Sequence, residues 1–288
     1  MKLSGAPKKS SLALRSWKKM TNNKLAMIGL IFSILMILAS VFAGAIAPYK
    51  PSEINLRLIT QAPSWQHLMG TDKLGRDVLT QLLYGGRVSI YVGIVGALFG
   101  SMLGLVLGCL AGYLGGALDR GLVHLSEIFL TFPNMILVMI LVGLIGQGVN
   151  NLIFIFVLTG WMTPFRMVRN EFLSLREETY VEVCRAFGIS DFSIMFRHIL
   201  PNALSPLFVS VTIQIASYIL QEAGLSFLGL GVPVTIPTWG NVMNAAKSID
   251  VIRNYWWLWL YPGLVISLFV LAVNFTGDGL RDVLDPKQ

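Results

Sequence analysis

The run VSIYVGIVGALFGSMLGLVLGCLAGYL occupies residues 88–114 and contains no charged residue. It is longer than the roughly 20 apolar residues that a helix needs to cross the hydrocarbon core of a bilayer. The run therefore predicts a transmembrane helix. It also makes lipid, rather than water, the solvent for the rest of the chain.

The overall composition agrees with that prediction. Of the 288 residues, 55% are hydrophobic and only 13% are charged, and the mean hydropathy is +0.68. The charged fraction is about half of the usual value for a globular domain. These figures exclude a disordered chain or a nucleic-acid-binding tail protein, and they disfavour an ordinary soluble enzyme.

Five more apolar runs lie on either side of the first, at residues 25–47, 122–145, 151–168, 204–230 and 256–275. The first of them ends in Ala-x-Ala, as a signal peptide can, but its length favours a retained span. We therefore expect an all-α membrane protein with six transmembrane helices. Its expected parts are a basic segment 1–24, a first transmembrane helix 25–47, an external loop 48–87, a five-helix core 88–277 containing a cytoplasmic segment 169–202, and a tail 278–288.

The distribution of Lys and Arg predicts the orientation. The net charge of +7 comes from residues 1–24, which hold seven basic residues and no acidic one. With six spans, 15 of the 22 Lys and Arg residues fall on the side of the N-terminus. The positive-inside rule then places both termini in the cytoplasm, with the basic segment against acidic lipid.

Glycine recurs at every fourth position along the second span, at Gly96, Gly100, Gly104, Gly108, Gly112 and Gly116. On a helix this spacing makes a stripe that winds slowly around the axis. Glycines in such a stripe let another backbone approach closely, so we expect this helix to face protein rather than lipid. The stripe is either a static packing surface or a contact along which helices slide.

The segment 169–202 is the longest polar stretch predicted to lie in the cytoplasm. Ser174 and Glu177 have capping-box spacing, which predicts a helix starting at Ser174. Its apolar stripe would consist of Tyr180, Val183, Cys184 and Phe187. Gly188 stands where a helix C′ residue would, and Ser190 is placed to cap a second helix that Pro201 ends.

Three functions suit such a helix pair. A DNA-binding helix-turn-helix is disfavoured, because the four Arg residues of the segment, together with Arg166 just before it, are balanced by five acidic residues. An amphipathic helix lying in the membrane interface remains open. We favour a docking helix for a cytoplasmic partner, whose movements the tethers to two spans would transmit.

The stretch EVCRAFGISDFSIMFRHILPN, residues 182–202, resembles the EAA motif of bacterial ABC importer permeases. Glu182, Gly188, Leu200 and Pro201 match the motif, while Val183 and Cys184 replace its two alanines and His198 stands where isoleucine is usual. HLMGTDKLGRDVLTQLLYGGRVS (67–89) and LQEAGLSFLGLGVPVTIPTWG (220–240) are similar to the second permease subunit of oligopeptide, dipeptide and nickel importers.

The resemblance implies a type I importer permease fold in the bacterial cytoplasmic membrane. It also implies a homologous sister permease, two ABC ATPase subunits and an external substrate-binding protein. The chain itself contains no G-x-x-x-x-G-K-[ST] motif, so ATP and Mg²⁺ would be used by the partner ATPases. We expect a non-catalytic subunit with no cofactor, no metal site and no nucleic-acid partner. An intramembrane enzyme is disfavoured, because the sequence contains no recognisable catalytic set.

Polar residues inside apolar runs are the candidates for a path through the membrane. They are Glu127, Asn134, Gln214, Gln221 and Glu222. An ion-coupled carrier would want more intramembrane charges than Glu127 and Glu222. The resemblance implies instead a permease for peptides, with nickel or another small solute as the alternative. Asp72, Arg76 and Asp77 in the external loop form either a local cap on the second span or a contact for a partner.

Overall fold

A computed structural model describes residues 20–21 and 23–284. Most of the basic segment 1–24 and the last four residues of the tail lie outside the described residues. Within the described residues the regular structure is helical, and Thr71 and Asp77 form an isolated bridge.

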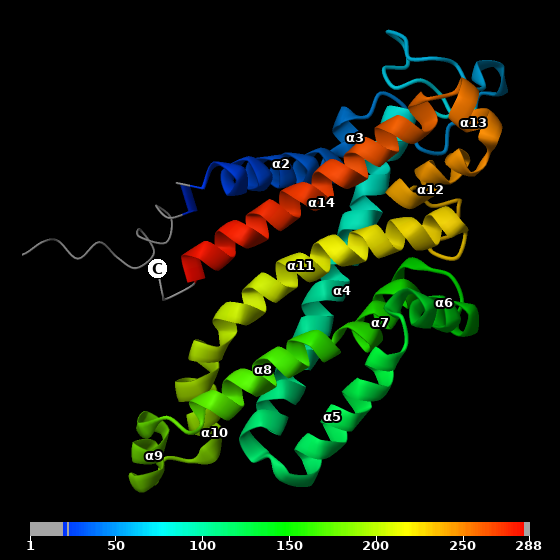
Figure 1. Ribbon diagram of the computed structural model, residues 1–288. Helices are drawn as coiled ribbons and strands as arrows, with labels where there is room; N and C mark the ends of the chain where they lie inside the picture. The colour runs from blue at the N-terminus through cyan, green and yellow to red at the C-terminus, as the bar shows by residue number, and fades with distance from the viewer. Residues whose placement is uncertain (1–19, 22, 285–288) are drawn as a thin grey trace, which may run out of the picture.

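The helices follow one another with short connections, and Figure 1 shows their arrangement. They are α2 (Lys24–Val41), α3 (Ala43–Ile46), η1 (Leu56–Leu58), α4 (Val78–Leu114), α5 (Gly116–Thr131), α6 (Asn134–Ile145), α7 (Val149–Gly160), α8 (Met162–Leu175), α9 (Thr179–Ala186), α10 (Asp191–Ser193), η2 (Ile194–Ile199), α11 (Leu200–Leu228), α12 (Trp239–Met243), η3 (Asn244–Lys247), α13 (Ile249–Asn254) and α14 (Trp257–Leu284).

Among the described residues, five helical segments are long and apolar enough to cross a membrane: α2, α4, α7 with α8, α10 through α11, and α14. A sixth span exists if α5 and α6 are counted together, although they meet at an angle of 91°. The sequence predicts one run over 122–145 here. The chain bends because Phe132 is extended (φ −90°, ψ 137°), as a residue before proline prefers, and Pro133 has no backbone N–H to continue the helix.

Helix α4 begins at Val78, whereas the sequence predicts a loop as far as residue 87. Asp77 caps the helix, with its carboxylate accepting a hydrogen bond from the Thr80 amide at 2.8 Å. The polar residues that follow are used inside the protein. Gln81 donates to the Pro51 carbonyl, and Arg87 donates to the Ser40 and Val41 carbonyls, each at 2.7 Å.

Helices α2 and α14 lie side by side along most of their length (Figure 1). A Cβ at Gly29 would lie 2.5 Å from the Ala272 carbonyl oxygen, and one at Gly279 would lie 2.3 Å from the Ala26 Cβ. The absence of these side chains lets the two backbones touch. Helix α14 continues to Leu284, so the tail predicted over 278–288 begins as helix.

The ends of the bundle differ. One end carries α9 and α10, and the opposite end carries the loop before α4 together with α12 and α13 (Figure 1). Between them, α4 and α11 cross near the middle, and the fully buried Trp239 anchors the core that they share with α12 and α14. We refer below to the α9 end and the α13 end.

Candidate functional site

The glycine stripe of α4 packs against α7 and α8. A Cβ at Gly104 would lie 2.5 Å from the Trp161 carbonyl oxygen, and one at Gly108 would lie 2.9 Å from the Phe165 carbonyl oxygen. At Gly112 the nearest atom, Phe172 Cβ, is 2.6 Å away. A Cβ at Gly96 would lie 3.2 Å from Phe156 Cβ of α7, and one at Gly100 would lie 3.6 Å from the Tyr218 hydroxyl of α11 and 3.7 Å from backbone atoms of α7.

Gly116 does not belong to this packed stripe. It is the first residue of α5 and follows Gly115, which links α4 to α5. Both glycines have positive φ (66° for Gly116 and 65° for Gly115), and nothing lies within 4 Å of a Cβ at Gly116. The period of four continues in the sequence beyond the point where the helix ends, because a turn with two positive φ angles also selects glycine.

A cavity of about 700 Å³ lies beside this packed face. Residues of α5 through α8, α11 and α14 line it. Three of the five residues that the sequence proposes for a path, Asn134, Gln214 and Gln221, are in its wall. Gln214 also ties α11 to its neighbours, since it donates to the Gly160 carbonyl at 3.1 Å and accepts from the Ser101 hydroxyl at 2.9 Å.

The two carboxylates that the sequence proposes for the path are not in the cavity wall. Glu222 is fully buried and accepts hydrogen bonds from the hydroxyls of Ser89 at 2.6 Å and Ser226 at 2.8 Å. Ser89 in turn accepts from the Trp239 amide at 3.1 Å. Glu222 therefore holds α4, α11 and the start of α12 together.

Glu127 lies on the outside of α5, with its side chain 52% exposed. Its neighbours are His124 at 3.2 Å and Arg166 of α8 at 4.0 Å. Because the carboxylate of Glu127 and the guanidinium of Arg166 are 4.0 Å apart and both side chains are exposed, their charges interact weakly. Neither carboxylate is placed to contact a solute in the cavity.

The segment between α8 and α11 differs from its prediction at both helix ends. Helix α8 runs through Ser174 to Leu175, so Ser174 is inside a helix and the next helix, α9, begins at Thr179. Pro201 does not end a helix either. It stands in the first turn of α11, where a proline is tolerated. The preceding residues, Ile194–Ile199, form a π-helical turn, whose hydrogen bonds differ from the α-helical ones that a proline ring would break.

Gly188 terminates α9 in a left-handed conformation, with φ +71°. Its amide donates to the Arg185 carbonyl at 2.9 Å, and the Ile189 amide donates to the Cys184 carbonyl at 3.1 Å. These two bonds make a Schellman motif, which fixes the direction in which the chain leaves α9.

Helix α9 divides its apolar residues between two environments. Val181, which the predicted stripe omits, is fully buried, and Tyr180 and Cys184 pack beside it against the ends of α4 and α8. Val183 and Phe187 point outward, with exposed fractions of 47% and 81%. The sequence-based stripe therefore combines two faces, because the helix is shorter and rotated relative to the predicted one.

The sequence analysis does not identify two exposed aromatic residues near α9. Phe192 is 72% exposed, and the centre of its ring lies 4.5 Å from that of Phe196, which is 40% exposed, with the two rings tilted by 41°. Their spacing of four residues after a capping serine is the signal that could have found them. We call Val183, Phe187, Phe192 and Phe196 the tip patch. Glu182 is exposed beside it.

Polar contacts fix the position of this end of the protein. The Tyr113 hydroxyl at the end of α4 donates to the Asp191 carboxylate, and the Arg185 guanidinium lies 5.6 Å from the centre of the Tyr113 ring. Arg169 of α8 forms an ion pair with Asp119 of α5. These contacts tie α9 and α10 to the end of α4, and α8 to α5.

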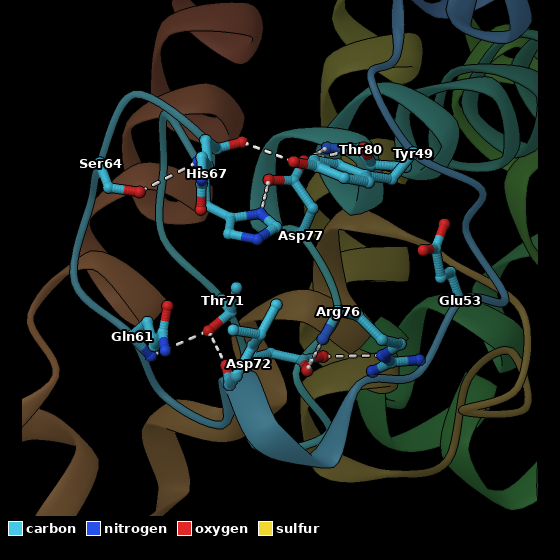
Figure 2. Close-up of polar contacts among 12 residues, drawn as sticks. Tyr49, Glu53, Gln61, Ser64, His67, Thr71, Asp72, Arg76, Asp77 and Thr80 are labelled. Carbon is cyan, nitrogen blue, oxygen red and sulfur yellow. Dashed lines mark hydrogen bonds and ion pairs between the residues drawn. The ribbon is translucent and has the colours of Figure 1, made fainter.

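At the α13 end, the loop before α4 is built as a local cap (Figure 2). His67 and Asp77 are buried and 3.0 Å apart, and the Tyr49 ring stacks on His67 at 4.8 Å. Arg76 donates to Asp72 at 2.7 Å. These contacts favour the first of the two functions considered for Asp72, Arg76 and Asp77, the cap on the second span.

The described part of the chain brings no three His, Cys, Asp or Glu side chains close enough together to hold a metal ion. Cys109 is buried and Cys184 is half-buried, and neither forms a disulfide. The arrangement offers a largely apolar cavity that carries amide and hydroxyl groups, and an exposed apolar tip.

Comparison with known proteins identifies this arrangement. Residues 104–288 match the family described as the binding-protein-dependent transport system inner membrane component, and residues 11–63 match the N-terminal transmembrane domain of oligopeptide transport permease C. A peptide permease protein of Brucella suis is 38% identical over 273 residues, which cover 95% of this chain and 90% of the relative. The oligopeptide transport system permease protein OppC of Bacillus subtilis is 35% identical over 286 residues, or 98% of this chain and 93% of the relative.

A solved structure shares the fold. A chain of the MetNI methionine ABC transporter, determined in inward-facing conformations, superposes with a TM-score of 0.56 over 71% of this chain and 96% of its own length, at 20% identity. These matches confirm the predicted all-helical ABC importer permease fold and the location in the bacterial inner membrane. The chain belongs to the family of inner-membrane permease components of binding-protein-dependent ABC transport systems.

Proposed function

We propose that this chain is one of two permease subunits of an ATP-driven peptide importer, and that the cavity beside α11 is its share of the path. The cavity carries the proposal. Its volume of about 700 Å³ is typical of a site for a small organic ligand. Its wall offers uncharged amides from Asn134, Gln214 and Gln221 and hydroxyls from serine and threonine residues. These groups suit a peptide better than an ion.

The missing parts of the machine would be other chains. A sister permease would close the path on its open side, and an external binding protein would deliver the peptide. Two ATPase subunits would bind and hydrolyse ATP with Mg²⁺, because this sequence has no phosphate-binding P-loop. The subunit itself would then catalyse no covalent reaction.

The tip patch is the proposed contact with an ATPase subunit. Phe187 and Phe192 expose more apolar surface than a residue at a water-facing helix end usually does, and a groove on the partner would cover them. The opposite side of α9 is fixed by Val181 and Tyr180 to the ends of α4 and α8. ATP-driven closure of the ATPase pair would therefore move the spans that border the cavity.

The deciding experiment is transport by the purified complex in proteoliposomes, with ATP inside and the binding protein outside. Uptake of an alanine peptide that requires both ATP and the binding protein would support the proposal. Uptake of Ni²⁺ but of no peptide would replace peptide with nickel. Uptake driven by a proton or sodium gradient without ATP would make the chain an ion-coupled carrier.

The coupling contact has its own matched pair of variants. Phe187→Ala and Ile249→Ala each remove one exposed apolar side chain, at the α9 end and the α13 end respectively; the two side chains are 81% and 69% exposed. We expect Phe187→Ala alone to weaken recovery of the ATPase chains when the permease is pulled down. Equal recovery with both variants would count against the tip patch.

A further inference from the structure

Helix α11 presents a ladder of polar side chains to the cavity. Ser210, Gln214, Ser217 and Gln221 all line it, at spacings of four, three and four residues. These intervals place the four side chains on one face of the helix. At 1.5 Å per residue the ladder is about 16 Å long, the length of roughly five residues of extended peptide.

Among the described residues that line the cavity, most of the surface is apolar, and the polar side chains carry amides and hydroxyls, apart from the guanidinium of Arg281 on α14. None of these described lining residues carries a carboxylate or an imidazole. A divalent cation such as Ni²⁺ binds to imidazole nitrogen or to carboxylate oxygen, which this half of the path does not offer. Amides and hydroxyls match the N–H and C=O groups of a peptide main chain.

The two glutamines of the ladder differ in their hydrogen bonds. Both ends of the Gln214 amide are occupied, by Ser101 and by the Gly160 carbonyl. The Oε1 atom of Gln221 is enclosed, yet it accepts no hydrogen bond from any residue that the structure describes. An enclosed acceptor without a donor is unfavourable. The side chain itself is only half-buried, so a turn of its amide toward the cavity would let this oxygen accept a bond from a group there.

We propose that Gln221 is a substrate-contacting residue that accepts hydrogen bonds from main-chain amides of the passing peptide, with Ser217 as its neighbour on the ladder. This inference rests on the proposed function and adds the chemistry that the path recognises. A path that contacts the main chain accepts peptides of many sequences. The discrimination among side chains is then left to the binding protein.

The test compares variants of the whole transporter in proteoliposomes, with labelled alanine peptides of two to five residues as probes. Gln221→Leu keeps the size of the side chain and removes its amide. Because the binding protein determines the peptide concentration at half-maximal uptake, we expect that concentration to stay unchanged. The maximal rate should fall about fivefold, as the loss of about one hydrogen bond predicts.

Three further variants separate this role from a structural one. Gln221→Asn keeps an amide and should retain more uptake than Gln221→Leu. Gln214→Leu breaks the ties to Ser101 and Gly160 and should lower the yield of assembled complex, which Gln221→Leu should not. Gln221→Glu places a carboxylate in the path and should reduce uptake of Ala-Glu-Ala more than that of Ala-Lys-Ala.

The outcomes are distinct. A full maximal rate for Gln221→Leu would overturn the role of Gln221 while leaving the peptide importer intact. If Gln221→Leu does not assemble, the comparison of Ala-Glu-Ala with Ala-Lys-Ala in Gln221→Glu decides, and an unchanged ratio overturns the proposal. A wild-type transporter that takes up none of the alanine peptides would instead refute the proposed function.

Discussion

At the scale of single residues, glycines inside helices differ in how much space lies beside their Cβ positions. A Cβ at Gly104 would meet three atoms of Trp161 and of the first turn of α8 within 2.8 Å, two of them backbone atoms that cannot rotate away. Gly121 is also inside a helix, but nothing lies within 4 Å of its Cβ position. The two positions therefore separate the loss of helix flexibility from a steric clash.

We predict that Gly104→Ala destabilises the protein and that Gly121→Ala does not. Forcing a methyl group into a packed contact typically costs about 1–3 kcal/mol, whereas alanine in an open helical position gains up to about 1 kcal/mol over glycine. Thermal unfolding of the purified permease in detergent would measure both. Similar unfolding temperatures for the two variants would contradict the close packing of α4 against α8.

Glu222 supports a second prediction at this scale. Glu222→Leu leaves the Ser89 and Ser226 hydroxyls without their acceptor in a buried position, which should cost about 2 kcal/mol. Glu222→Gln keeps one carbonyl oxygen and should cost less. The measurement is thermal unfolding together with protease sensitivity of the loop before α12, which Ser89 holds through the Trp239 amide. Full stability of Glu222→Leu would show that this network does not hold the loop.

Sequence alone could identify the polar residues inside the spans but not the directions in which they point. Gln221 and Glu222 are adjacent, yet one lines the cavity and the other is buried against α4 and α12. The position along the apolar run gives the depth of a residue in the membrane. The rotation of the helix about its axis depends on packing against neighbours, which hydropathy does not contain.

At the scale of helices, the predicted apolar runs exist, and apart from the bend at Pro133 the errors lie at their ends. Gln81 and Arg87 look like loop residues, but their hydrogen bonds to carbonyls of the preceding segment let α4 start at Val78. Ser174 has the spacing of a cap but lies inside α8. Capping patterns describe what a residue can do locally, and tertiary contacts decide whether the chain uses it.

Gly188 is the helix end for which sequence and structure agree in detail, and it supports a third prediction. Nothing lies within 4 Å of a Cβ there, so a side chain would fit, and only the φ of +71° resists substitution. Gly188→Val should therefore cost about 1–2 kcal/mol at the turn, and Gly188→Asn much less, since asparagine tolerates this conformation. ATP-driven uptake and recovery of the ATPase chains should fall with Val and persist with Asn. Equal behaviour of the two variants would mean that the Schellman turn does not set the position of α10.

At the scale of the whole molecule, the number of spans depends on α5 and α6. The described helices give five clear spans, and the bent pair gives a sixth if both of its parts are taken together. Composition predicts enough apolar residues for six but cannot predict the 91° bend, which arises where Pro133 interrupts the hydrogen bonds. Helices α4 and α8 both end at the α9 end (Figure 1). After α4 the chain must therefore leave that end through α5 and α6 before α7 and α8 return to it.

The last prediction concerns the orientation of the whole protein. The Asn23 amide at the start of α2 donates to Asp282 near the end of α14 at 3.1 Å, so the start of α2 and the end of α14 lie on the same side, as six spans require. The excess of Lys and Arg on that side, 15 of 22, places it in the cytoplasm. After replacement of Cys109 and Cys184, single cysteines at Trp65, Ile249 and Phe187 report the two sides, because their side chains are 97%, 69% and 81% exposed. A membrane-impermeant thiol reagent applied to intact cells should label the first two and reach Phe187→Cys only after permeabilisation. Labelling of Phe187→Cys from outside would show that the protein has the opposite orientation. The tip patch would then face away from the compartment that holds ATP.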